Sequence, residues 1–239
     1  MQYSLVIPAH NEADNLPPLL SEILALPESH RPFEIILVDD GSRDRTALLM
    51  AGMIAAEPRL RLVRLPVHSG QSAAMLAGVR AARSEWVATI DADGENDPAD
   101  LPRMIDMARA SGVDLIGGLR RRRKSSWSKQ VASRLANGIR RHVLKDDCSD
   151  SACGLKLFRR SQLLQLPSFN GMHRFLPALV QIAGGQPRFI EVNDRPRRHG
   201  RSNYGNLSRA ARGLVDLCGV LWLKRRSLAE AVRAAKEGS

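Results

Sequence analysis

The chain has 239 residues, 44% of them hydrophobic, which suits one large α/β domain with an ordinary buried core. No stretch approaches the roughly 18 uninterrupted apolar residues of a membrane-spanning helix, and the first residues lack the basic leader and cleavage site of a signal peptide. The formal net charge of +11 is unevenly distributed along the chain. Residues 1–118 carry ten arginines and seventeen acidic residues, whereas residues 119–239 carry 26 basic and eight acidic residues. This asymmetry predicts an acidic, metal-binding half and a basic half that faces an anionic partner.

Strand-like and helix-like segments alternate through the first half. The expected strands are residues 3–8, 33–38, 60–65, 85–90 and 114–117. The expected helices are residues 11–26, with Asn11 as N-cap, 46–56, 72–82 and 98–110. This alternation predicts an α/β fold with a mostly parallel sheet covered by helices on both faces, in which ligands bind beyond the carboxyl ends of the strands.

The second half is less regular. Helices are expected at residues 131–143 and 173–183, and residues 193–206 form a loop-like segment rich in Arg and Gly. Residues 208–227 form an amphipathic stretch, which fits a helix on a membrane surface or a helix in the core or in a dimer contact. The three cysteines lack CxxC spacing, so neither a disulfide framework nor a zinc site is expected. A reducing, cytoplasmic setting is the expected environment.

Two acidic turns follow expected strands. In IDADGEND (residues 90–97), Asp91 and Asp93 stand one residue apart, and carboxylates so placed are ligands that Mg²⁺ or Mn²⁺ takes together with substrate phosphates. A calcium loop is a poor fit because Gly94 comes two positions too early for the EF-hand pattern and Pro102 stands where its last glutamate belongs. The alternative is a turn of solvated acids.

The other acidic turn is DDGSRDRT (residues 39–46). One interpretation is a strand-to-helix turn in which Ser42 or Asp44 caps the following helix. The other is that Asp39 or Asp40 hydrogen-bonds a nucleotide base or ribose. One turn can do both, so the sequence leaves the two interpretations open.

Seven motifs, taken in order, resemble the signatures of family two glycosyltransferases, which have the GT-A fold. They are VIPAHNE, VDDGSRDRT, HSGQSAAMLAGVRAA and IDADGENDP in the first half, and GLRRRRKSS, SACGLKLFRR and RPRRHGRSNYG in the second. The later motifs are similar to those of dolichol-phosphate mannose synthases and bacterial polyprenyl-phosphate glycosyltransferases. The resemblance runs from about Tyr3 to about Gly205, and it implies a Rossmann-like, mostly parallel sheet flanked by helices, with an amphipathic C-terminal helix.

The resemblance implies a nucleotide site and a metal site in the first half. The implied nucleotide-binding residues are Pro8, His10, Glu12, Asp39, Asp40, Gly70, Gln71 and Asp91. The implied metal ligands are Asp91, Asp93 and Glu95, with Mg²⁺ or Mn²⁺ as the cofactor. The family often has Tyr at the position of His10, and dolichol-phosphate mannose synthases often have Gln at that of Glu95.

An acceptor site is implied in the second half. The residues matched to the acceptor phosphate are Arg120, Ser151, Lys156, Arg198, Arg201 and Asn203, with Gly154 in the same turn as Ser151 and Lys156. Asn203 replaces a Lys that is frequent in the family. The residues expected to act in the transfer itself are Asp93, Arg120, Arg198 and Arg201. The implied organisation is a nucleotide-sugar half at 1–118, an acceptor half of the same catalytic domain at 119–205, and a helical segment at 206–239.

The implied activity is inverting transfer of a sugar, from GDP-mannose or a UDP-sugar, to dolichyl or undecaprenyl phosphate in cell-envelope glycosylation. A polyprenyl phosphate is already an anion, so no strong base is needed, and arginine forks with a cation on the donor diphosphate would offset the repulsion between two polyanions. The expected location is the cytoplasmic face of the membrane, as a peripheral protein on an anionic surface.

Other functional classes fit less well. A nucleotidyltransferase could use a similar sheet and metal site, but it would release pyrophosphate. A processive polysaccharide synthase is not expected because the chain has no QxxRW-like stretch. A nucleic-acid partner is not expected because aromatic content is 4% and no recognition motif is present. Intact Asp91 and Asp93 argue against a silent scaffold. The sequence leaves the donor, the lipid and homo-oligomerisation open.

Overall fold

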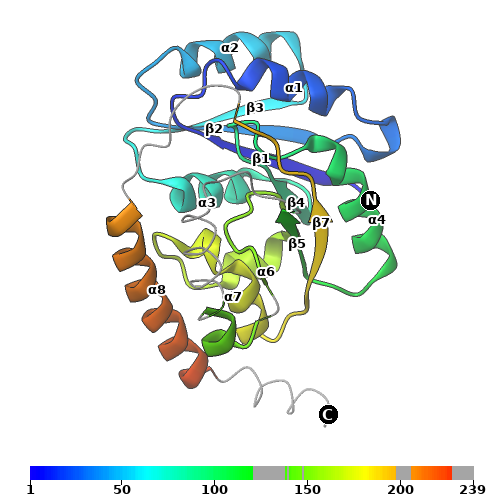
Figure 1. Cartoon of the computed structure of the whole chain (residues 1–239). Coiled ribbons are helices and arrows are strands. Elements are labelled where there is room, and N and C mark those ends of the chain that lie inside the picture. The colour runs from blue at the N-terminus through cyan, green and yellow to red at the C-terminus, as the bar shows by residue number, and fades with distance from the viewer. Residues whose placement is uncertain (121–137, 139, 147, 198–205, 228–239) are drawn as a thin grey trace.

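The structure, a computed structural model, describes residues 1–120, 138, 140–146, 148–197 and 206–227, and only the backbone of 206–211. Within these residues, seven strands form one sheet with the order β3-β2-β1-β4-β6-β5-β7 (Figure 1). The strands are β1 (Tyr3–Ala9), β2 (Glu34–Asp40), β3 (Leu60–Leu65), β4 (Trp86–Thr89), β5 (Leu115–Arg120), β6 (Lys156–Arg159) and β7 (Pro187–Val192).

Helices connect the strands. The helices with both ends in the described residues are α1 (Leu16–Leu24), α2 (Thr46–Ala56), α3 (Gln71–Ala81), α4 (Leu101–Ala110), α6 (Arg160–Gln165), α7 (Leu176–Ile182) and α8 (Asn206–Arg226). Three short 3₁₀ turns are η1 (Glu28–His30), η2 (Pro98–Asp100) and η3 (Met172–Arg174).

Strand direction gathers the loops that matter at one edge of the sheet. β1 pairs in parallel with β2 and β4, β2 with β3, and β5 with β7, whereas β6 runs antiparallel to both β4 and β5. Among the described strands, all except β6 therefore end at the same edge of the sheet, and β6 begins at that edge. The chain order reverses between β1 and β4, and such a switch point opens a crevice at the carboxyl ends of the strands.

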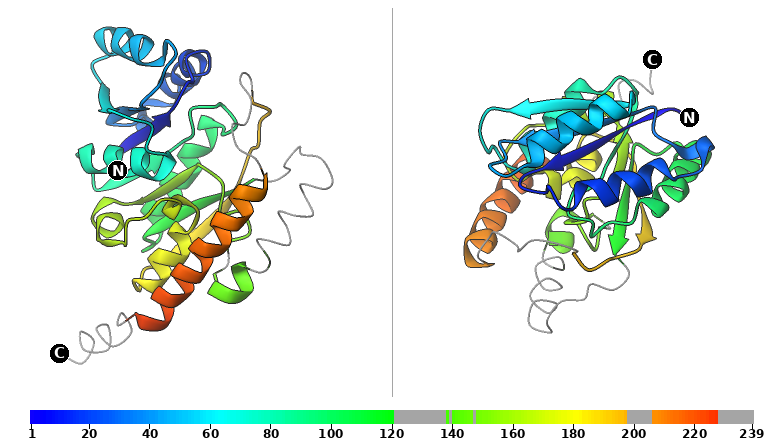
Figure 2. Two further views of the ribbon diagram at one scale, coloured as in Figure 1. Left: turned by 90° about the vertical axis from the view of Figure 1, so that its left-hand side faces the viewer. Right: turned by 90° about the horizontal axis from the view of Figure 1, so that it is seen from above.

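Two hydrophobic layers enclose the sheet. Helices α1, α2 and α4 cover one face, and α3, α6, α7 and α8 cover the other (Figures 1 and 2). β1 shows how the sequence serves both layers, because Leu5 and Ile7 belong to the first cluster and Val6 to the second. Burial on both faces explains why the central strands read as continuous apolar runs.

Most predicted elements of the first half are confirmed. The helix at 46–56 and the strand at 60–65 match within their bounds, and the other strands shift by one to three residues at their ends. The helix expected at 11–26 is shorter than predicted, since α1 begins at Leu16. Asn11 is not its cap: it has φ +58, and its Oδ1 accepts hydrogen bonds from the backbone of Arg43 and Asp44.

The second half holds three elements that periodicity does not predict, namely β6, α6 and β7. β6 and α6 are four and six residues long, too short to establish a period. The helix expected at 173–183 is confirmed in shortened form as η3 and α7. Residues 138 and 140–143 of the helix expected at 131–143 are helical, and the others lie outside the described residues. None of the described helices is both long and apolar enough to cross a membrane.

Candidate active site

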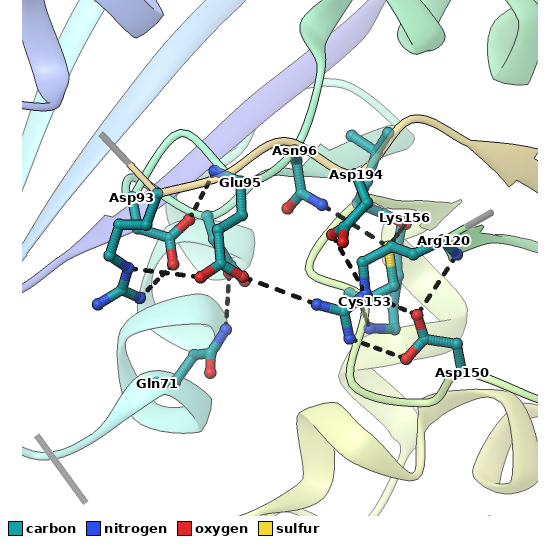
Figure 3. A network of polar contacts seen from close by, with 12 residues as sticks. Gln71, Asp93, Glu95, Asn96, Arg120, Asp150, Cys153, Lys156 and Asp194 are labelled. Atoms are coloured by element: carbon teal, nitrogen blue, oxygen red, sulfur yellow. Dashed lines mark hydrogen bonds and ion pairs between the residues drawn. The ribbon is translucent and has the colours of Figure 1, made fainter. Parts of the chain in front are cut away.

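Charged side chains converge at the carboxyl edge of the sheet. Asp39 and Asp40 end β2, Asp91 and Asp93 follow β4, and Arg120 ends β5. Figure 3 shows the part of this network that reaches from Gln71 and Asp93 to Arg120 and Asp150. Parallel pairing of distant strands has thus brought the two acidic turns to one crevice.

The buried acids of the β2 turn organise the loop around them. Asp39 Oδ1 accepts a hydrogen bond from the backbone N–H of Ser42 at 2.9 Å. Asp40 accepts from the backbone N–H groups of Ser69 at 2.7 Å and Gly70 at 2.9 Å, so it fixes the start of α3. Neither Ser42 nor Asp44 is the N-cap of α2, because the helix is preceded by Arg45, which makes no side-chain cap hydrogen bond. Asp44 still accepts the N–H of Thr46, the first residue of α2, at 2.9 Å, whereas Ser42 Oγ accepts the N–H of Asn11 at 3.0 Å.

Two histidine rings stand over the β2 turn. His10, the first residue after β1, has its Nδ1 2.7 Å from the Asp40 carbonyl oxygen. His68 Nδ1 lies 2.8 Å from Asp40 Oδ2, and the His10 and His68 ring centroids are 3.9 Å apart. A tilted pair of imidazoles therefore stands where the family often has a Tyr, and no periodicity in the sequence marks His68.

Asp91 is held by contacts from two other elements. Gln71 Nε2, at the start of α3, donates to Asp91 Oδ1 at 2.7 Å. Gly154 lies so close that a Cβ there would fall on the Asp91 carboxyl group. Burial, and then the neighbouring Asp93 carboxylate, raise the pKa of Asp91 to about 7. Two carboxyl groups whose charges interact in this way favour a shared cation.

Arg197 supplies positive charge to the same turn. Its Nη2 donates to Asp93 Oδ2, and its Nε lies 3.4 Å from Glu95 Oε1. Burial acts to lower the pKa of Arg197, but Asp93 and then Glu95 raise it. Burial and the Asp93 charge raise the pKa of Glu95. The guanidinium thus occupies a position where a cation bridging Asp93 and Glu95 is stabilised.

A short antiparallel contact explains why Arg197 reaches Asp93. Asn96 and Asp194 form an isolated β-bridge, and the N–H of Arg195 donates to the Glu95 carbonyl at 2.9 Å. Arg195 also pairs with Glu22, with Nη1 2.5 Å from Oε2. The chain after β7 therefore lies along the acidic turn. Sequence reasoning placed arginines of this segment near phosphate but did not single out position 197.

Arg120 forms a bidentate ion pair with a carboxylate of the protein itself. Its Nε and Nη2 donate to the two oxygens of Asp150 at 2.6 and 2.9 Å, and its side chain is 5% exposed. Burial opposes a raised pKa, but the Asp150 hydrogen bonds outweigh it and raise the pKa of Arg120. Arg120 Nη1 also lies 3.8 Å from Glu95 Oε2, so Arg120 ties the β5 end to the acidic turn.

Of the remaining residues predicted to bind the acceptor, some are buried in the described structure and others lie outside it. Lys156 is buried at the start of β6, where its Nζ donates to the Cys153 carbonyl, and Ser151 is buried in the preceding turn. Figure 3 shows Lys156 inside the network beside Cys153 and Arg120, and its charge acts to lower the pKa of Asp91. Arg198, Arg201 and Asn203 lie outside the described residues. The nucleotide-side residues Pro8 and Glu12 lie in β1 and just after it, and Glu12 accepts from Asn15 Nδ2 at 2.6 Å.

The donor set at the β4 turn fits Mg²⁺ or Mn²⁺. Asp91 and Asp93 offer carboxylate oxygens, which these ions prefer, and Arg197 stands in for positive charge there. Ligand atoms of His10, Asp40 and His68 also lie within 4.8 Å of one another. The Asp40 oxygens already accept two backbone N–H groups, so the β4 turn is the better site for a cation that carries phosphates.

Comparison with known proteins places the chain in a family. Residues 4–166 match the model of glycosyl transferase family 2, and the chain belongs to that family. It is 37% identical over 231 residues to dodecaprenyl-phosphate galacturonate synthase of Rhizobium johnstonii, covering 94% of this chain and 68% of that protein. It is 35% identical over 205 residues to undecaprenyl-phosphate 4-deoxy-4-formamido-L-arabinose transferase of Edwardsiella ictaluri, covering 84% of this chain and 62% of that protein. The chain thus spans about two thirds of the length of these relatives.

Solved structures confirm the predicted GT-A type of fold. Glucosyl-3-phosphoglycerate synthase from Mycobacterium tuberculosis, crystallised with Mn²⁺, UDP and phosphoglyceric acid, aligns with a TM-score of 0.68 at 19% identity, covering 93% of this chain and 78% of that one. The same enzyme was also crystallised with Mg²⁺ and UDP, and that structure aligns with a TM-score of 0.67 at 21% identity, covering 91% and 79%.

Proposed function

We propose that this chain is an inverting glycosyltransferase that moves a sugar from a nucleotide sugar to a polyprenyl phosphate with the help of Mg²⁺ or Mn²⁺. The observation that carries the proposal is the position of Asp91 and Asp93 at the switch point of the sheet. Two relatives named as transferases or synthases acting on polyprenyl phosphates support the acceptor class. A family fold crystallised elsewhere with UDP and Mn²⁺ supports the donor class and the cofactor.

The described residues divide the task between two sides of the crevice. The β2 turn offers polar groups to the base and ribose, and the tilted pair of His10 and His68 rings beside it offers them an aromatic surface. Asp91 and Asp93 would hold the cation, which when bound neutralises the diphosphate leaving group. Arg197 would leave Asp93 as the cation and diphosphate enter, and its charge would then serve the phosphates.

The reaction needs no general base from the protein. An oxygen of the acceptor phosphate attacks the anomeric carbon, the bond from that carbon to the diphosphate oxygen breaks, and the nucleoside diphosphate leaves with the electron pair. No proton is transferred because the attacking phosphate is already ionised. The chain's own contribution is to align the two anions and to lower their repulsion.

The proposed location is the cytoplasmic face of the membrane, with α8 against the lipid headgroups. One side of α8 packs into the second core cluster through Val220. The other side exposes Leu214, Val215 and Trp222, followed by basic residues at the end of the helix. Apolar side chains next to arginines suit an interfacial helix on anionic lipid.

The test of the proposed function is a transfer assay on the purified full chain. GDP-, UDP- and dTDP-sugars are each offered with Mn²⁺ or Mg²⁺ and undecaprenyl phosphate. We expect one donor class to yield a glycosylated lipid phosphate and a nucleoside diphosphate in equal amounts. Release of pyrophosphate would identify a nucleotidyltransferase instead, and absence of any product with all donors would contradict the proposal.

Gly154→Ala is expected to weaken Mn²⁺ binding at least about tenfold. The added methyl group would overlap the Asp91 carboxyl group, which must shift from the position it holds beside Gln71. The measurement is calorimetric titration of Mn²⁺ in the presence of UDP. Gly112→Ala is the matched control, because a Cβ at Gly112 meets nothing within 4 Å. Equal Mn²⁺ affinity in all three proteins would remove Asp91 from the metal site.

Metal binding is expected to strengthen as pH rises from 6 to 8. Burial and Asp93 raise the pKa of Asp91 to about 7, so at pH 6 the cation must displace a proton. One such proton predicts about tenfold weaker Mn²⁺ binding at pH 6 than at pH 8. Because the folded state keeps this proton to a higher pH than the unfolded state, Asp91 also lowers the stability of the metal-free protein as pH rises from about 4 to about 7.

Titrations in buffers of different ionisation enthalpy measure both the affinity and the protons released. We expect about one proton released at pH 6 and almost none at pH 8. The exposed Asp106→Asn variant, far from this turn on α4, should keep the same pH dependence. Mn²⁺ affinity that stays flat between pH 6 and pH 8 would contradict the assignment.

A further inference from the structure

A second feature of the crevice is a cavity of about 470 Å³ that begins beside the β2 turn, where His68 and Ser69 line it and both contact Asp40. It is lined by the start of α3, the turn at residues 170–174 and the first half of α8. Helix α8 runs along the side of the molecule past α3 and α7, so this cavity lies between the core and a surface helix (Figures 1 and 2). Of the predicted acceptor residues that the structure describes, namely Arg120, Ser151 and Lys156, none lines it.

The cavity carries positive charge. Among the described lining residues, Arg174 and Arg212 carry positive charge and Asp216 carries the one carboxylate. Half-buried Arg174 has no side-chain hydrogen bond or ion pair among the residues that the structure describes. Asp216 is set close to the 170–174 turn, since a Cβ at Gly171 would lie 2.6 Å from its Oδ2. Two guanidinium groups and one carboxylate leave the lining with a net positive charge.

His173 adds a neutral donor to the same lining. Ser72 Oγ accepts the backbone N–H of Gly171 at 3.0 Å and of His173 at 3.4 Å, so both of its lone pairs are used. Its one proton must then go to His173 Nδ1, which lies 2.7 Å away. Burial, and then the charges of Arg174 and Lys156, lower the pKa of His173 to about 3. The neutral ring therefore carries its proton on Nε2.

The start of α3 also adds positive potential to the cavity. Gly70 is the N-cap with φ +92 and provides no side-chain cap, so the first backbone N–H groups of this 11-residue helix are left for other acceptors. Gly70 and Gln71 both line the cavity. Positive helix potential, two guanidinium groups and a neutral N–H donor together suit a phosphate monoester.

The cavity also connects the two substrates of the proposed reaction. Gln71 lines it and donates to Asp91 at 2.7 Å, so a phosphate held there lies beside the carboxylates of the β4 turn. On the other side, Arg212 and Asp216 lie within one turn of Leu214 and Val215, which are 61% and 72% exposed. A lipid phosphate could thus have its headgroup in the cavity and its chain on the exposed side of α8.

We propose that Arg174 and Arg212 bind the phosphate of the polyprenyl acceptor in the cavity between α3, the 170–174 turn and α8. The proposal rests on the proposed function for the identity of the lipid. It moves the acceptor phosphate away from Arg120 and Lys156, whose side chains are engaged with Asp150 and the Cys153 carbonyl.

The test compares Arg174→Gln with Arg174→Lys and with Arg188→Gln, which removes an exposed arginine of β7 outside the cavity lining. The probes are farnesyl phosphate, inorganic phosphate, and UDP with Mn²⁺, each titrated into the full chain. We expect Arg174→Gln to weaken farnesyl phosphate binding at least about tenfold and to raise the acceptor KM by a similar factor. UDP binding should change less than about twofold, which also reports that the variant is folded.

Arg174→Lys should fall between the wild type and Arg174→Gln, and Arg188→Gln should match the wild type. Equal binding of farnesyl phosphate by wild type and Arg174→Gln, with transfer intact, would overturn the cavity assignment and leave the proposed function standing. A loss confined to UDP binding would assign the cavity to the donor and overturn it too. If inorganic phosphate binds as tightly as farnesyl phosphate, the claim that the bound phosphate belongs to a lipid would be contradicted. Wild type that neither binds farnesyl phosphate nor transfers sugar to lipid would contradict both proposals.

Discussion

Replacing Asp93 with Asn is expected to lower the rate of metal-dependent sugar transfer by about 10²- to 10³-fold while leaving the fold intact. The amide removes one of two negative charges that would hold the cation on the diphosphate, and loss of one such electrostatic contact typically costs about 3–4 kcal/mol in the transition state. The variant keeps the side-chain oxygen that accepts the Glu95 N–H at 3.1 Å, so the turn should remain folded. The measurement is kcat/KM with saturating Mn²⁺, alongside the thermal unfolding midpoint.

The matched control is Asp106→Asn, which removes one carboxylate from the exposed surface of α4. We expect it to retain wild-type transfer within about twofold. Full activity in Asp93→Asn would remove the β4 turn from the proposed metal site. A lowered unfolding midpoint in Asp93→Asn would instead assign the loss of activity to the fold, and Mn²⁺ titration of the folded fraction would separate the two.

The sheet could be predicted from the sequence because its central strands are buried on both faces. The runs ending at Pro8 and Val38 are continuous and apolar, and each is followed by a helix with apolar residues at helical spacing. β6 gave no such signal, since it is four residues long and begins with the buried Lys156. Its antiparallel pairing with β4 and β5 depends on contacts between residues about 40 to 70 positions apart, which local periodicity does not report.

The acidic turn was predictable for the same reason as the strands. Asp91 and Asp93 follow a buried strand directly, and the end of a parallel strand fixes where they lie. Their partners were not predictable, because Arg197 reaches Asp93 only through the bridge between Asn96 and Asp194. The alternation of Arg195 and Arg197 along an extended segment was the available signal. Their opposing carboxylates stand about 100 or more positions away.

Arg120 illustrates the limit of carrying a role over by position. The strand end was placed correctly within β5, but the guanidinium is bound by Asp150, a residue without a motif role. Its side chain is 5% exposed and paired with Asp150, and its role toward the acceptor phosphate stays a prediction. Charge balance within the second half could not reveal this, because a net excess of arginine does not say which of them lacks a carboxylate.

Replacing Leu214, Val215 and Trp222 together by Ser is expected to weaken binding to anionic vesicles at least about 10²-fold. These three side chains are 61%, 72% and 61% exposed on α8, and partial insertion of each into the headgroup region would contribute about 1 kcal/mol or more. Val220, which packs in the core, is unchanged, so the helix should stay docked. The measurement is co-sedimentation with vesicles containing phosphatidylglycerol, with transfer to a short soluble acceptor as the check on folding.

Leu48→Ser is the matched control, because Leu48 is 73% exposed on α2, which covers the opposite face of the sheet. Loss of membrane binding only in the triple variant would support α8 as the contact, whereas an equal loss in Leu48→Ser would attribute binding to general surface hydrophobicity. The alternative for this helix is a contact between two copies of the chain. Light scattering that shows a wild-type dimer becoming a monomer in the triple variant, with vesicle binding unchanged, would favour that alternative, since the same three side chains cannot cover a partner and insert into lipid at once.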